Sequence, residues 1–337
     1  MRLIRSLNVP DLPLARVVAL GNFDGLHRGH AHIFSHAKTL ARKLGHTPLV
    51  FTFDPHPLKV LRGAGSVRLL QSVPQKLNTL SAWGFEEVVL FPFTHDFSLL
   101  TPEQFMRDIL LDRLRVAGVV VGTLFNFGHD RKGDAPMLEE FGRAHGFPVI
   151  GVPPIRHKGH VISSTWIRKC IEDADLAEAA ELLGRPYSID GKVVEGDRRG
   201  SALGFPTANI VASHDVLPPS GVYLTACLLH DTLHPALTNI GYRPTFGSSS
   251  QLLIETHLLD FSGDLYARDI ELFFLARLRD EARFESATAL TRELEADRAA
   301  AREFFSRQRL PPLSVCRPLL PETDAEGLTP DRRPRSS

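Results

Sequence analysis

The sequence has little cysteine and no excess of either charge. Its three cysteines, Cys170, Cys227 and Cys316, lie far apart and include no C-x-x-C pair. An odd and scattered set of thiols is neither a disulfide framework nor a zinc motif, so we expect a reducing compartment. The 39 basic residues are balanced by 39 acidic residues. This balance gives no global reason to expect a nucleic acid or a membrane surface as partner.

Long apolar runs are also missing. No segment approaches the roughly 18 apolar residues that a membrane helix requires, and residues 1–13 lack the apolar core of a signal peptide. We therefore expect a cytoplasmic protein that acts on small molecules, as a monomer or a weak homo-oligomer. A chain of 337 residues is long for one compact domain and comfortable for two.

The first half alternates two kinds of segment. Short apolar runs predict buried strands, and stretches with apolar residues three or four apart predict helices. The predicted strands are 16–20, 48–53, 87–91, 118–122 and 149–152, and the predicted helices are 30–44, 75–84 and 101–115. Strands that alternate with helices predict a parallel sheet with helices on both faces.

The second half has a different pattern. An Ala-, Leu- and Glu-rich segment, 164–183, predicts one helix that ends at Gly184-Arg185-Pro186. Short apolar runs separated by Gly, Pro, Asn and Ser then predict an antiparallel barrel or sandwich, followed by a helix. The predicted strands are 187–194, 221–229, 237–240, 252–259 and 269–274, and the helix is 286–308. Residues 311–337 have little to bury, and we expect them to be largely disordered.

A candidate site lies between the first predicted strand and the first predicted helix, in Gly21-Asn22-Phe23-Asp24-Gly25-Leu26-His27-Arg28-Gly29-His30. Open α/β sheets bind ligands at the carboxyl ends of their strands, and a helix start offers free N–H groups to a phosphate. Gly25 and Gly29 permit a tight turn and close approach of the backbone. His27 and His30 can donate to phosphate oxygens while charge shifts between phosphates. The segment therefore predicts a nucleotidyl-transfer site, which relies on positioning and electrostatics.

Other interpretations of this segment stay open. It is compatible with a plain loop that carries surface histidines. His32 and His36, four residues apart, have the spacing of a metal pair, although the sequence offers no third ligand nearby. The Gly-rich, basic segment 122–134 favours the phosphate interpretation, as do the hydroxyls and the arginine of 162–168 at a helix start. On that last segment alone, simple helix capping is the more economical explanation.

A second candidate site lies in the C-terminal half, in Gly204-Phe205-Pro206-Thr207-Ala208-Asn209. Thr207 and Asn209 point the same way in an extended segment, and their oxygens suit Mg²⁺ that carries nucleotide phosphates. An ordinary turn is the alternative. Glu255 lies in an apolar run, L-L-I-E-T-H-L-L, and is either a base with an adjusted pKa or a solvent-facing residue of an edge strand. The spacing does not decide between these two. The charged segment 278–284 has the composition of a solvated connection.

Taken together, these segments resemble the prokaryotic bifunctional riboflavin kinase/FAD synthetase family, over about residues 16–307. The matching pieces occur along both halves of the chain. They are G-N-F-D-G-L-H-R-G-H at 21–30, T-F-D-P-H-P at 52–57, F-G-H-D-R-K-G-D at 127–134, I-S-S-T-W-I-R at 162–168, L-L-G-R-P-Y at 182–187, L-G-F-P-T-A-N at 203–209, N-I-G-Y-R-P-T-F-G at 239–247, I-E-T-H-L-L-D-F at 254–261 and L-R-D-E-A-R-F at 278–284.

The resemblance implies a fold and two activities. It implies an α/β nucleotidylyltransferase domain with a Rossmann-like parallel sheet over 1–183, and a Greek-key β-barrel riboflavin kinase domain with a C-terminal helix over 184–310. The second domain would phosphorylate riboflavin to FMN. The first would adenylylate FMN to FAD and release pyrophosphate. The implied co-substrate is ATP and the implied metal is Mg²⁺.

The resemblance also implies residue roles. His27 and His30 bind and stabilise the phosphates, and Glu255 is the base that activates the ribityl 5′-hydroxyl. Thr207 and Asn209 match the Mg²⁺ and phosphate positions. The remaining predicted ligand contacts match other motif positions of the two domains; they are Asn22, Asp24, Gly29, Asn126, Ser164, Thr165, Arg168, Gly204 and Arg279.

The sequence departs from the family pattern at a few positions. Leu124 stands where Asp or Asn is usual, and leucine cannot hydrogen-bond a substrate; Asn126 shares its face if the segment is extended. Trp166, Ser201, Ala202 and Ala267 also differ from the usual residues. Two alternatives to the bifunctional enzyme follow. One is a riboflavin kinase with weakened or lost adenylyltransferase activity, and the other is a regulatory protein that binds flavin or nucleotide without turnover.

Overall fold

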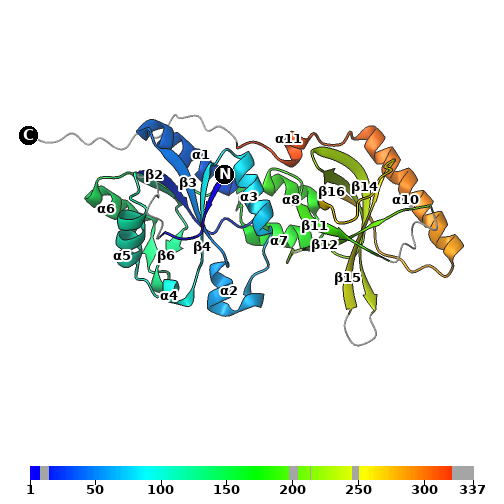
Figure 1. Ribbon diagram of the computed structural model, residues 1–337, viewed down its shortest axis with the longest axis horizontal. Helices are drawn as coiled ribbons and strands as arrows, with labels where there is room; N and C mark the ends of the chain where they lie inside the picture. Colours follow the sequence, from blue (N-terminus) through cyan, green and yellow to red (C-terminus); the bar gives the residue numbers. More distant parts are fainter. Residues whose placement is uncertain (8–14, 197–203, 213, 245–249, 321–337) are drawn as a thin grey trace, which may run out of the picture.

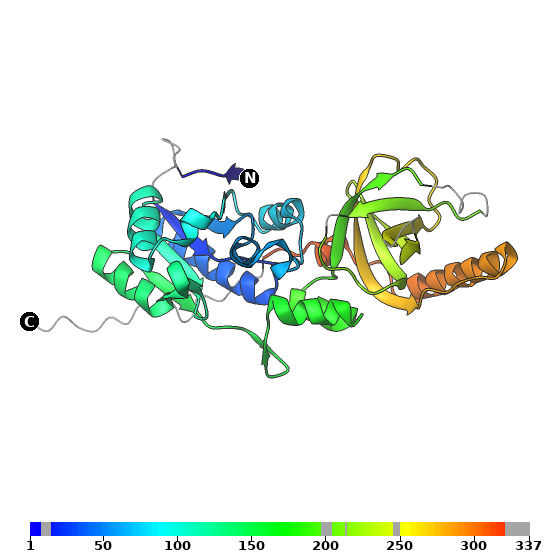
Figure 2. The same cartoon turned by 90° about the horizontal axis from the view of Figure 1, so that it is seen from below.

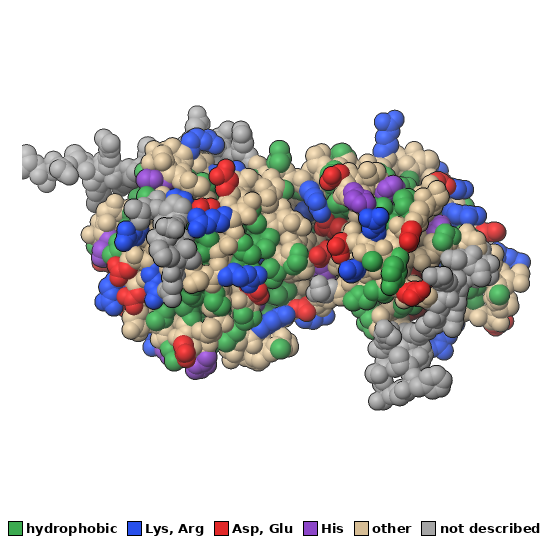
Figure 3. All heavy atoms as spheres, in the orientation of Figure 1, with side chains coloured by type: hydrophobic (Ala, Val, Ile, Leu, Met, Phe, Trp, Pro, Cys, Tyr) green, Lys and Arg blue, Asp and Glu red, His purple; other side chains and the backbone are tan. Residues whose placement is uncertain are grey.

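The computed structural model describes residues 1–7, 15–196, 204–212, 214–244 and 250–320. The chain forms two lobes that lie side by side, an α/β domain followed by a β-barrel domain (Figure 1). Figure 3 shows charged side chains of both signs along the junction between the lobes. Within these described ranges, no helix combines the length and the apolarity that a bilayer crossing requires.

The N-terminal domain is built on a six-stranded parallel sheet. Its strand order is β1-β4-β3-β2-β5-β8, so the chain changes direction across the sheet between β2 and β5. Its strands are β1 (Arg2–Ile4), β2 (Arg16–Leu20), β3 (Thr47–Phe53), β4 (Glu87–Phe91), β5 (Gly118–Gly122) and β8 (Val149–Val152). The parallel sheet predicted for this half is confirmed, and β1 is a strand that the pattern did not predict.

Helices cover both faces of this sheet, which is why its strands are mostly apolar. On one face, Val17 and Ala19 pack with residues of α1 and α3. On the other face, Val18 and Leu20 pack with residues of η2 and α6. The helices are α1 (Arg28–Leu44), α2 (Pro57–Arg62), α3 (Val73–Ala82), α4 (His95–Ser98), α5 (Pro102–Gln104), the π-helix η2 (Phe105–Arg113) and α6 (Ala135–His145). Short 3₁₀ turns and strand pairs complete the domain; they are η1 (Ala64–Ser66), η3 (His129–Arg131), β6 (Asn126–Phe127) with β7 (Gly133–Asp134), and β9 (Arg156–His157) with β10 (His160–Val161).

The single helix predicted over 164–183 is wrong, because the structure divides it in two. Helix α7 spans Ser164–Glu172 and α8 spans Leu176–Leu183. The Asp175 side chain accepts a hydrogen bond from the Glu178 N–H and starts a new helix. Ala174, just before it, has a left-handed φ of 59°. The two helices lie between the sheet and the barrel (Figure 2).

The C-terminal domain is a closed antiparallel barrel, as predicted. Its strand order is β11-β12-β15-β14-β13-β16, and β16 pairs with β11 to close it. The strands are β11 (Ser188–Val194), β12 (Ala208–Ala212), β13 (Gly221–Leu229), β14 (Thr232–Pro244), β15 (Ser250–Leu258) and β16 (Asp269–Arg279). Strand β12 was not predicted, and β14 and β16 are longer than predicted. Large apolar side chains such as Tyr223 and Phe274 fill the interior.

Helix α10 (Ala287–Arg307) packs on the outside of the barrel, against a cluster that includes Val222 and Leu224. The segment after it corrects the prediction of disorder over 311–337. Helix α11 spans Leu313–Cys316, and the Cys316 side chain is fully buried against the barrel. The Trp83 indole N–H then donates to the Pro318 carbonyl at 2.9 Å. Residues up to 320 therefore have defined contacts, and 321–337 lie outside the described residues.

Candidate active sites

The two predicted histidines lie together at the carboxyl end of the parallel sheet. His27 is the N-cap of α1, and its Nδ1 accepts a hydrogen bond from the His30 N–H at 3.4 Å. The two imidazole rings stack with 3.6 Å between their centroids. A Cβ at Gly29 would lie 3.1 Å from the His27 ring, so a glycine lets this ring rest against the helix start. The predicted phosphate loop is thus a compact histidine pair on a helix N-terminus.

Both histidines are neutral at physiological pH. Burial, with a smaller effect of the Arg185 cation, lowers the pKa of His27 to about 3. Burial also lowers the pKa of His30 well below its usual value, helped by His27, Lys76 and Arg185. Because Nδ1 of His27 accepts a hydrogen bond, the proton of its neutral ring belongs on Nε2. A neutral N–H donor can bind a phosphate oxygen without titrating during the reaction.

Asp24 connects this loop to the second predicted ATP motif. Arg168 donates from Nη2 to one Asp24 carboxylate oxygen at 2.6 Å, and the Leu70 N–H donates to the other at 2.9 Å. The Ser164 hydroxyl donates to the Asp24 main-chain carbonyl at 2.9 Å. Ser163, just before it, is the N-cap of α7. The loop and the start of α7 are therefore held as one unit.

A cavity of about 440 Å³ lies over this unit. It sits where the strand order changes direction, which is the usual ligand position in open α/β sheets. Its walls include eight of the predicted ligand residues of this domain: Asn22, Asp24, His27, Gly29, His30, Ser164, Thr165 and Arg168. Leu124 also lines it and is 68% exposed. Asn126 does not line it; its amide nitrogen donates to the Gly133 carbonyl, and its amide oxygen accepts from Arg131.

Two residues near this cavity were not predicted. His56 lines it, and burial lowers the pKa of His56 to about 4. Lys76 lies buried on α3, where its Nζ donates to the Asn22 carbonyl at 3.3 Å. Burial lowers the pKa of Lys76. His56 belongs to the T-F-D-P-H-P motif, so the sequence held a signal for it; Lys76 follows no motif that we identified.

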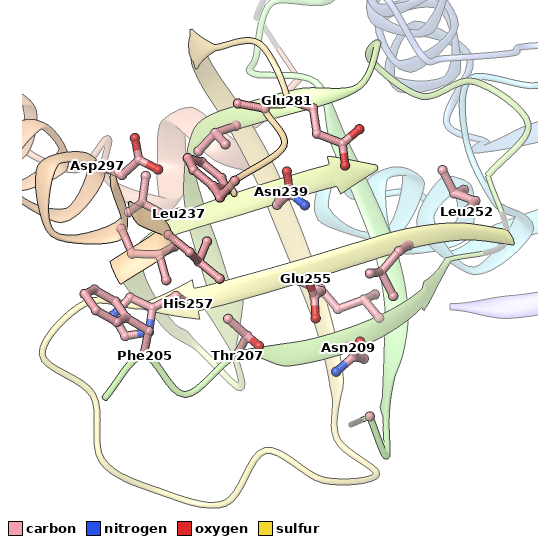
Figure 4. A pocket seen from close by; sticks show the side chains of 18 of the residues that line it. Phe205, Thr207, Asn209, Leu237, Asn239, Leu252, Glu255, His257, Glu281 and Asp297 are labelled. Atoms are coloured by element: carbon pink, nitrogen blue, oxygen red, sulfur yellow. The ribbon is translucent and has the colours of Figure 1, made fainter. Parts of the chain in front are cut away.

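The C-terminal site residues lie on neighbouring strands of the barrel. Glu255 on β15 is the register partner of Asn209 on β12 and of Asn239 on β14. Figure 4 shows Thr207, Asn209, Glu255 and Asn239 around one cavity. Asn239 was not singled out from the sequence, although it opens the N-I-G-Y-R-P-T-F-G motif. The arrangement brings a carboxylate, two amides and a hydroxyl to one place.

The structure removes the edge-strand interpretation of Glu255. Strand β15 lies between β12 and β14 in a closed barrel, so Glu255 is not on an edge strand. Its neighbours Ile254 and Thr256 are buried on the other face of the strand. Glu255 lines a cavity of about 590 Å³, whose other walls include Phe205, Phe284 and Leu290. A carboxylate beside aromatic and aliphatic walls is well placed to act on a flat, largely apolar substrate.

A second cavity of about 450 Å³ adjoins the first. The two share the wall residues Thr207 and Asn209, together with 194–196. A Cβ at Gly196 would lie 1.9 Å from the Asn209 amide nitrogen, so a side chain there would displace this amide. Gly204 lines neither cavity; it is exposed in a turn with φ of 80°. Thr207 and Asn209 thus stand where a group could pass from one cavity to the other.

Arg279 lines the larger cavity and is anchored by α10. Its Nε and Nη2 donate to the two carboxylate oxygens of Asp297, at 2.8 and 2.7 Å. Its guanidinium also lies 5.9 Å from the centroid of the Phe284 ring. Asp297 is buried and was not predicted, because nothing local in the helix pattern distinguishes it. The pair holds the end of β16 against the helix that covers the cavity.

The described part of each domain holds no metal cage built from protein ligands alone. Across the described residues, no cluster of three or more His, Cys, Asp or Glu side chains could hold a metal ion. The His32 and His36 rings lie edge to face, 4.6 Å apart between their centroids. Mg²⁺ that is bound through nucleotide phosphates needs only one or two protein oxygens. The Thr207 hydroxyl, the Asn209 amide and the Glu255 carboxylate are oxygen donors of that kind. The barrel site therefore fits a phosphate-bound Mg²⁺ better than a dedicated metal site.

The fold and the two sites define a two-domain transferase that uses nucleotides. Comparison with known proteins then places the chain more narrowly: it belongs to the family of bifunctional riboflavin kinase/FMN adenylyltransferases. The family model described as FAD synthetase matches residues 10–166, and the one described as riboflavin kinase matches residues 183–305. The family resemblance found in the sequence motifs is confirmed.

Relatives with this name cover nearly the whole chain. The protein of Escherichia coli strain K12 is 38% identical over 308 residues, which are 90% of this chain and 98% of that protein. The protein of Pseudomonas fluorescens is 36% identical and covers 90% of this chain and 97% of its own length. A crystal structure from Streptococcus pneumoniae, described as a macrolide-efflux protein, has a TM-score of 0.81 and 31% identity. It covers 89% of this chain and 98% of its own.

Proposed function

We propose that the chain makes FAD from riboflavin in two ATP-dependent steps, with FMN as the intermediate. The observation that carries the proposal is the presence of two separate cavities, each lined by one set of predicted catalytic residues. The histidine pair lines the cavity in the α/β domain, and Glu255 lines the cavity in the barrel. Residues 1–183 would transfer the adenylyl group and residues 184–310 the phosphoryl group. We keep the cytoplasm, and a monomer or weak homo-oligomer, as expectations for this enzyme.

In the kinase step, riboflavin occupies the cavity with apolar walls and ATP occupies the adjoining one. The Glu255 carboxylate accepts the proton of the ribityl 5′-hydroxyl, whose oxygen bonds to the γ-phosphorus of ATP as the bond to the ADP oxygen breaks. Thr207 and Asn209, at the boundary of the cavities, bind the phosphates and their Mg²⁺. Bound Mg²⁺ supplies charge neutralisation for the transferred group. Asn209 and Asn239 flank Glu255 and orient it.

In the adenylyl-transfer step, a phosphate oxygen of FMN bonds to the α-phosphorus of ATP as the bond to pyrophosphate breaks. The N–H groups at the start of α1 and the Nε2–H of His27 donate to the phosphate oxygens. His30 extends this donor set from the same helix. Thr165 and Arg168, at the start of α7, line the same cavity and add donors on its other side. No side chain needs to bond to the substrate.

Leu124 favours a second candidate, a riboflavin kinase with slow adenylyl transfer. Its side chain is exposed in the cavity wall and offers no hydrogen bond to FMN or ATP. Asn126, the nearest amide in the sequence, does not line this cavity and does not replace it.

One assay separates these candidates. Purified protein is incubated with riboflavin, ATP and Mg²⁺, and the flavins are resolved by liquid chromatography. The bifunctional enzyme yields FMN first and FAD later. Accumulation of FMN alone supports the second candidate, and unconverted riboflavin with measurable flavin binding supports a regulatory protein without turnover.

A further inference from the structure

We propose that Arg185, at the junction of the two domains, is a positioning residue for the histidine loop of the adenylyl-transfer site. Arg185 lies between α8 and β11. It is 160 residues away from Gly25 in the sequence. It does not line the adenylyl-transfer cavity. The expected effect on catalysis rests on the proposed function. The contact between Arg185 and the loop does not depend on that function.

The guanidinium of Arg185 holds two consecutive carbonyls of the loop. Nη2 donates to the Gly25 carbonyl and Nη1 donates to the Leu26 carbonyl, both at 2.9 Å. The next residue in the chain is His27. One planar cation that spans two adjacent peptide units fixes their orientation, which a single donor cannot do.

The held segment is one that would not keep its shape alone. Gly25 has φ of 84°, and Leu26 has φ of 42° although it carries a side chain. A left-handed backbone at a branched apolar residue costs free energy and persists only where the surroundings impose it. A Cβ at Gly25 would lie 2.6 Å from the Leu70 side chain, so this turn is also tightly packed. The hydrogen bonds from Arg185 to the Gly25 and Leu26 carbonyls stabilise this turn.

Arg185 also brings a buried charge to the loop. The residue is 7% exposed, and burial lowers the pKa of its guanidinium to about 10, so it remains a cation. The groups that face His27 are the His30 ring and this cation, and Lys76 on α3 faces His30. All of them disfavour protonation of the histidine pair. Arg185 therefore supports both the shape of the loop and the neutral form of its histidines.

A neighbouring arginine provides a matched control. Arg317 lies at the same junction and pairs with Glu271 of β16. Glu271 also accepts from Gln75 of α3 and from Ser188 of β11. Loss of Arg317 disturbs the domain junction without removing a contact to the histidine loop. The two arginines thus separate a local effect on the loop from a general effect on domain association.

The test compares Arg185→Gln, Arg185→Lys and Arg317→Gln in the full chain. Hydrogen exchange of peptides that cover 21–31 is measured by mass spectrometry, and kcat and KM are measured separately for FMN adenylylation and riboflavin phosphorylation. We expect Arg185→Gln to speed exchange in 21–31 and to lower kcat for FAD formation by about 10- to 100-fold. Riboflavin phosphorylation should change less than about twofold. In the pH–rate profile of FAD formation, the fall in rate on the acid side should move to higher pH in Arg185→Gln. It should stay in place in Arg185→Lys, which retains the charge.

Three results would overturn the inference. Unchanged exchange in 21–31 for Arg185→Gln would show that the contact does not hold the loop. Equal losses in Arg185→Gln and Arg317→Gln would show a general weakening of the junction. Equal losses of both activities in Arg185→Gln, with a lowered melting temperature, would show a folding defect. If the parent protein forms no FAD from FMN, the proposed function fails, and the exchange measurement still decides the role of Arg185.

Discussion

Arg279 and Asp297 form a two-bond ion pair between the last barrel strand and helix α10, with distances of 2.8 and 2.7 Å. The pair stands at the wall of the proposed flavin cavity. The shape of that cavity therefore depends on the position of α10. Kinase activity should therefore depend on a helix that contributes no catalytic group.

We predict that Asp297→Ala raises the KM for riboflavin and lowers the free energy of unfolding by about 1–3 kcal/mol. The substitution removes the carboxylate that binds Arg279 in a partly buried site. Steady-state kinetics and urea unfolding measure the two effects. Glu303→Ala is the control, since it breaks an exposed pair with Arg307 on the same helix. An unchanged KM in Asp297→Ala would contradict the role of the pair.

We predict that Glu255→Gln lowers kcat for riboflavin phosphorylation by about 10²- to 10⁴-fold, the usual contribution of a general base. The amide keeps the size of the side chain but cannot take the hydroxyl proton. FMN adenylylation by the same sample should remain. Glu295→Gln, at an exposed position of α10, is the matched control. Loss of both activities would point to misfolding or to a wrong assignment of the domains.

We predict that His30→Ala lowers FAD formation from FMN by about 10²- to 10³-fold, the range for loss of one preorganised donor to a transferring group. Riboflavin phosphorylation should persist. His32→Ala changes the same residue type two positions further along α1 and should leave both rates unchanged. FAD formation at the parental rate in His30→Ala would refute the proposed role.

The buried histidine pair also predicts a dependence of stability on pH. The pKa of folded His27 is about 3, below its ordinary value of 6.5, so only the unfolded chain takes up this proton as the pH falls. The contribution is present above about pH 6.5 and is lost toward pH 3, by up to about 1.4 kcal/mol per pH unit.

Urea unfolding at pH 7.5 and 5.5 measures this loss. Between these values the parent protein should lose about 1.4 kcal/mol more than His27→Gln does. His95→Gln, on the exposed helix α4, should behave like the parent. Identical losses in parent and His27→Gln would contradict a neutral buried His27.

We predict that Leu124→Asn increases the rate of FAD formation, because it places an amide in the wall of the adenylyl-transfer cavity. The side chain is 68% exposed, so the substitution should leave the melting temperature unchanged. Product analysis with FMN and ATP measures the effect. An unaltered rate would remove the main argument for a weakened adenylyltransferase.

Features that depend on neighbouring residues in the chain could be predicted from the sequence. The alternation of apolar strands and helices predicted the parallel sheet, and the Gly-rich connection before α1 predicted where a cavity-lining loop lies. The division of 164–183 was missed, because apolar spacing runs through it and only the cap at Asp175 competes. The helix over 313–316 was missed because its burial depends on the outer face of the barrel.

The candidate sites show the same limit. The motifs singled out Thr207 and Glu255, which line one cavity, but the spacing left the edge-strand interpretation of Glu255 open. Closure of the barrel removes that interpretation, and it depends on β12, which the apolar pattern did not reveal. The contacts of Lys76, Asp297 and Arg185 are with residues outside their own local segments, which local patterns do not reveal. Residues 201–203 and 245–247, which the motif comparison also used, lie outside the described residues.

The contact of Trp83 with Pro318 gives the protein a spectroscopic property. The chain has two tryptophans, and the indole of Trp83 lies 3% exposed at the seam between the domains, with its N–H bonded to the C-terminal segment. Indole emission depends on the polarity and hydrogen bonding around the ring. Release of this segment would therefore change the intrinsic fluorescence, so the molecule carries an unlabelled optical reporter of how its two domains are joined.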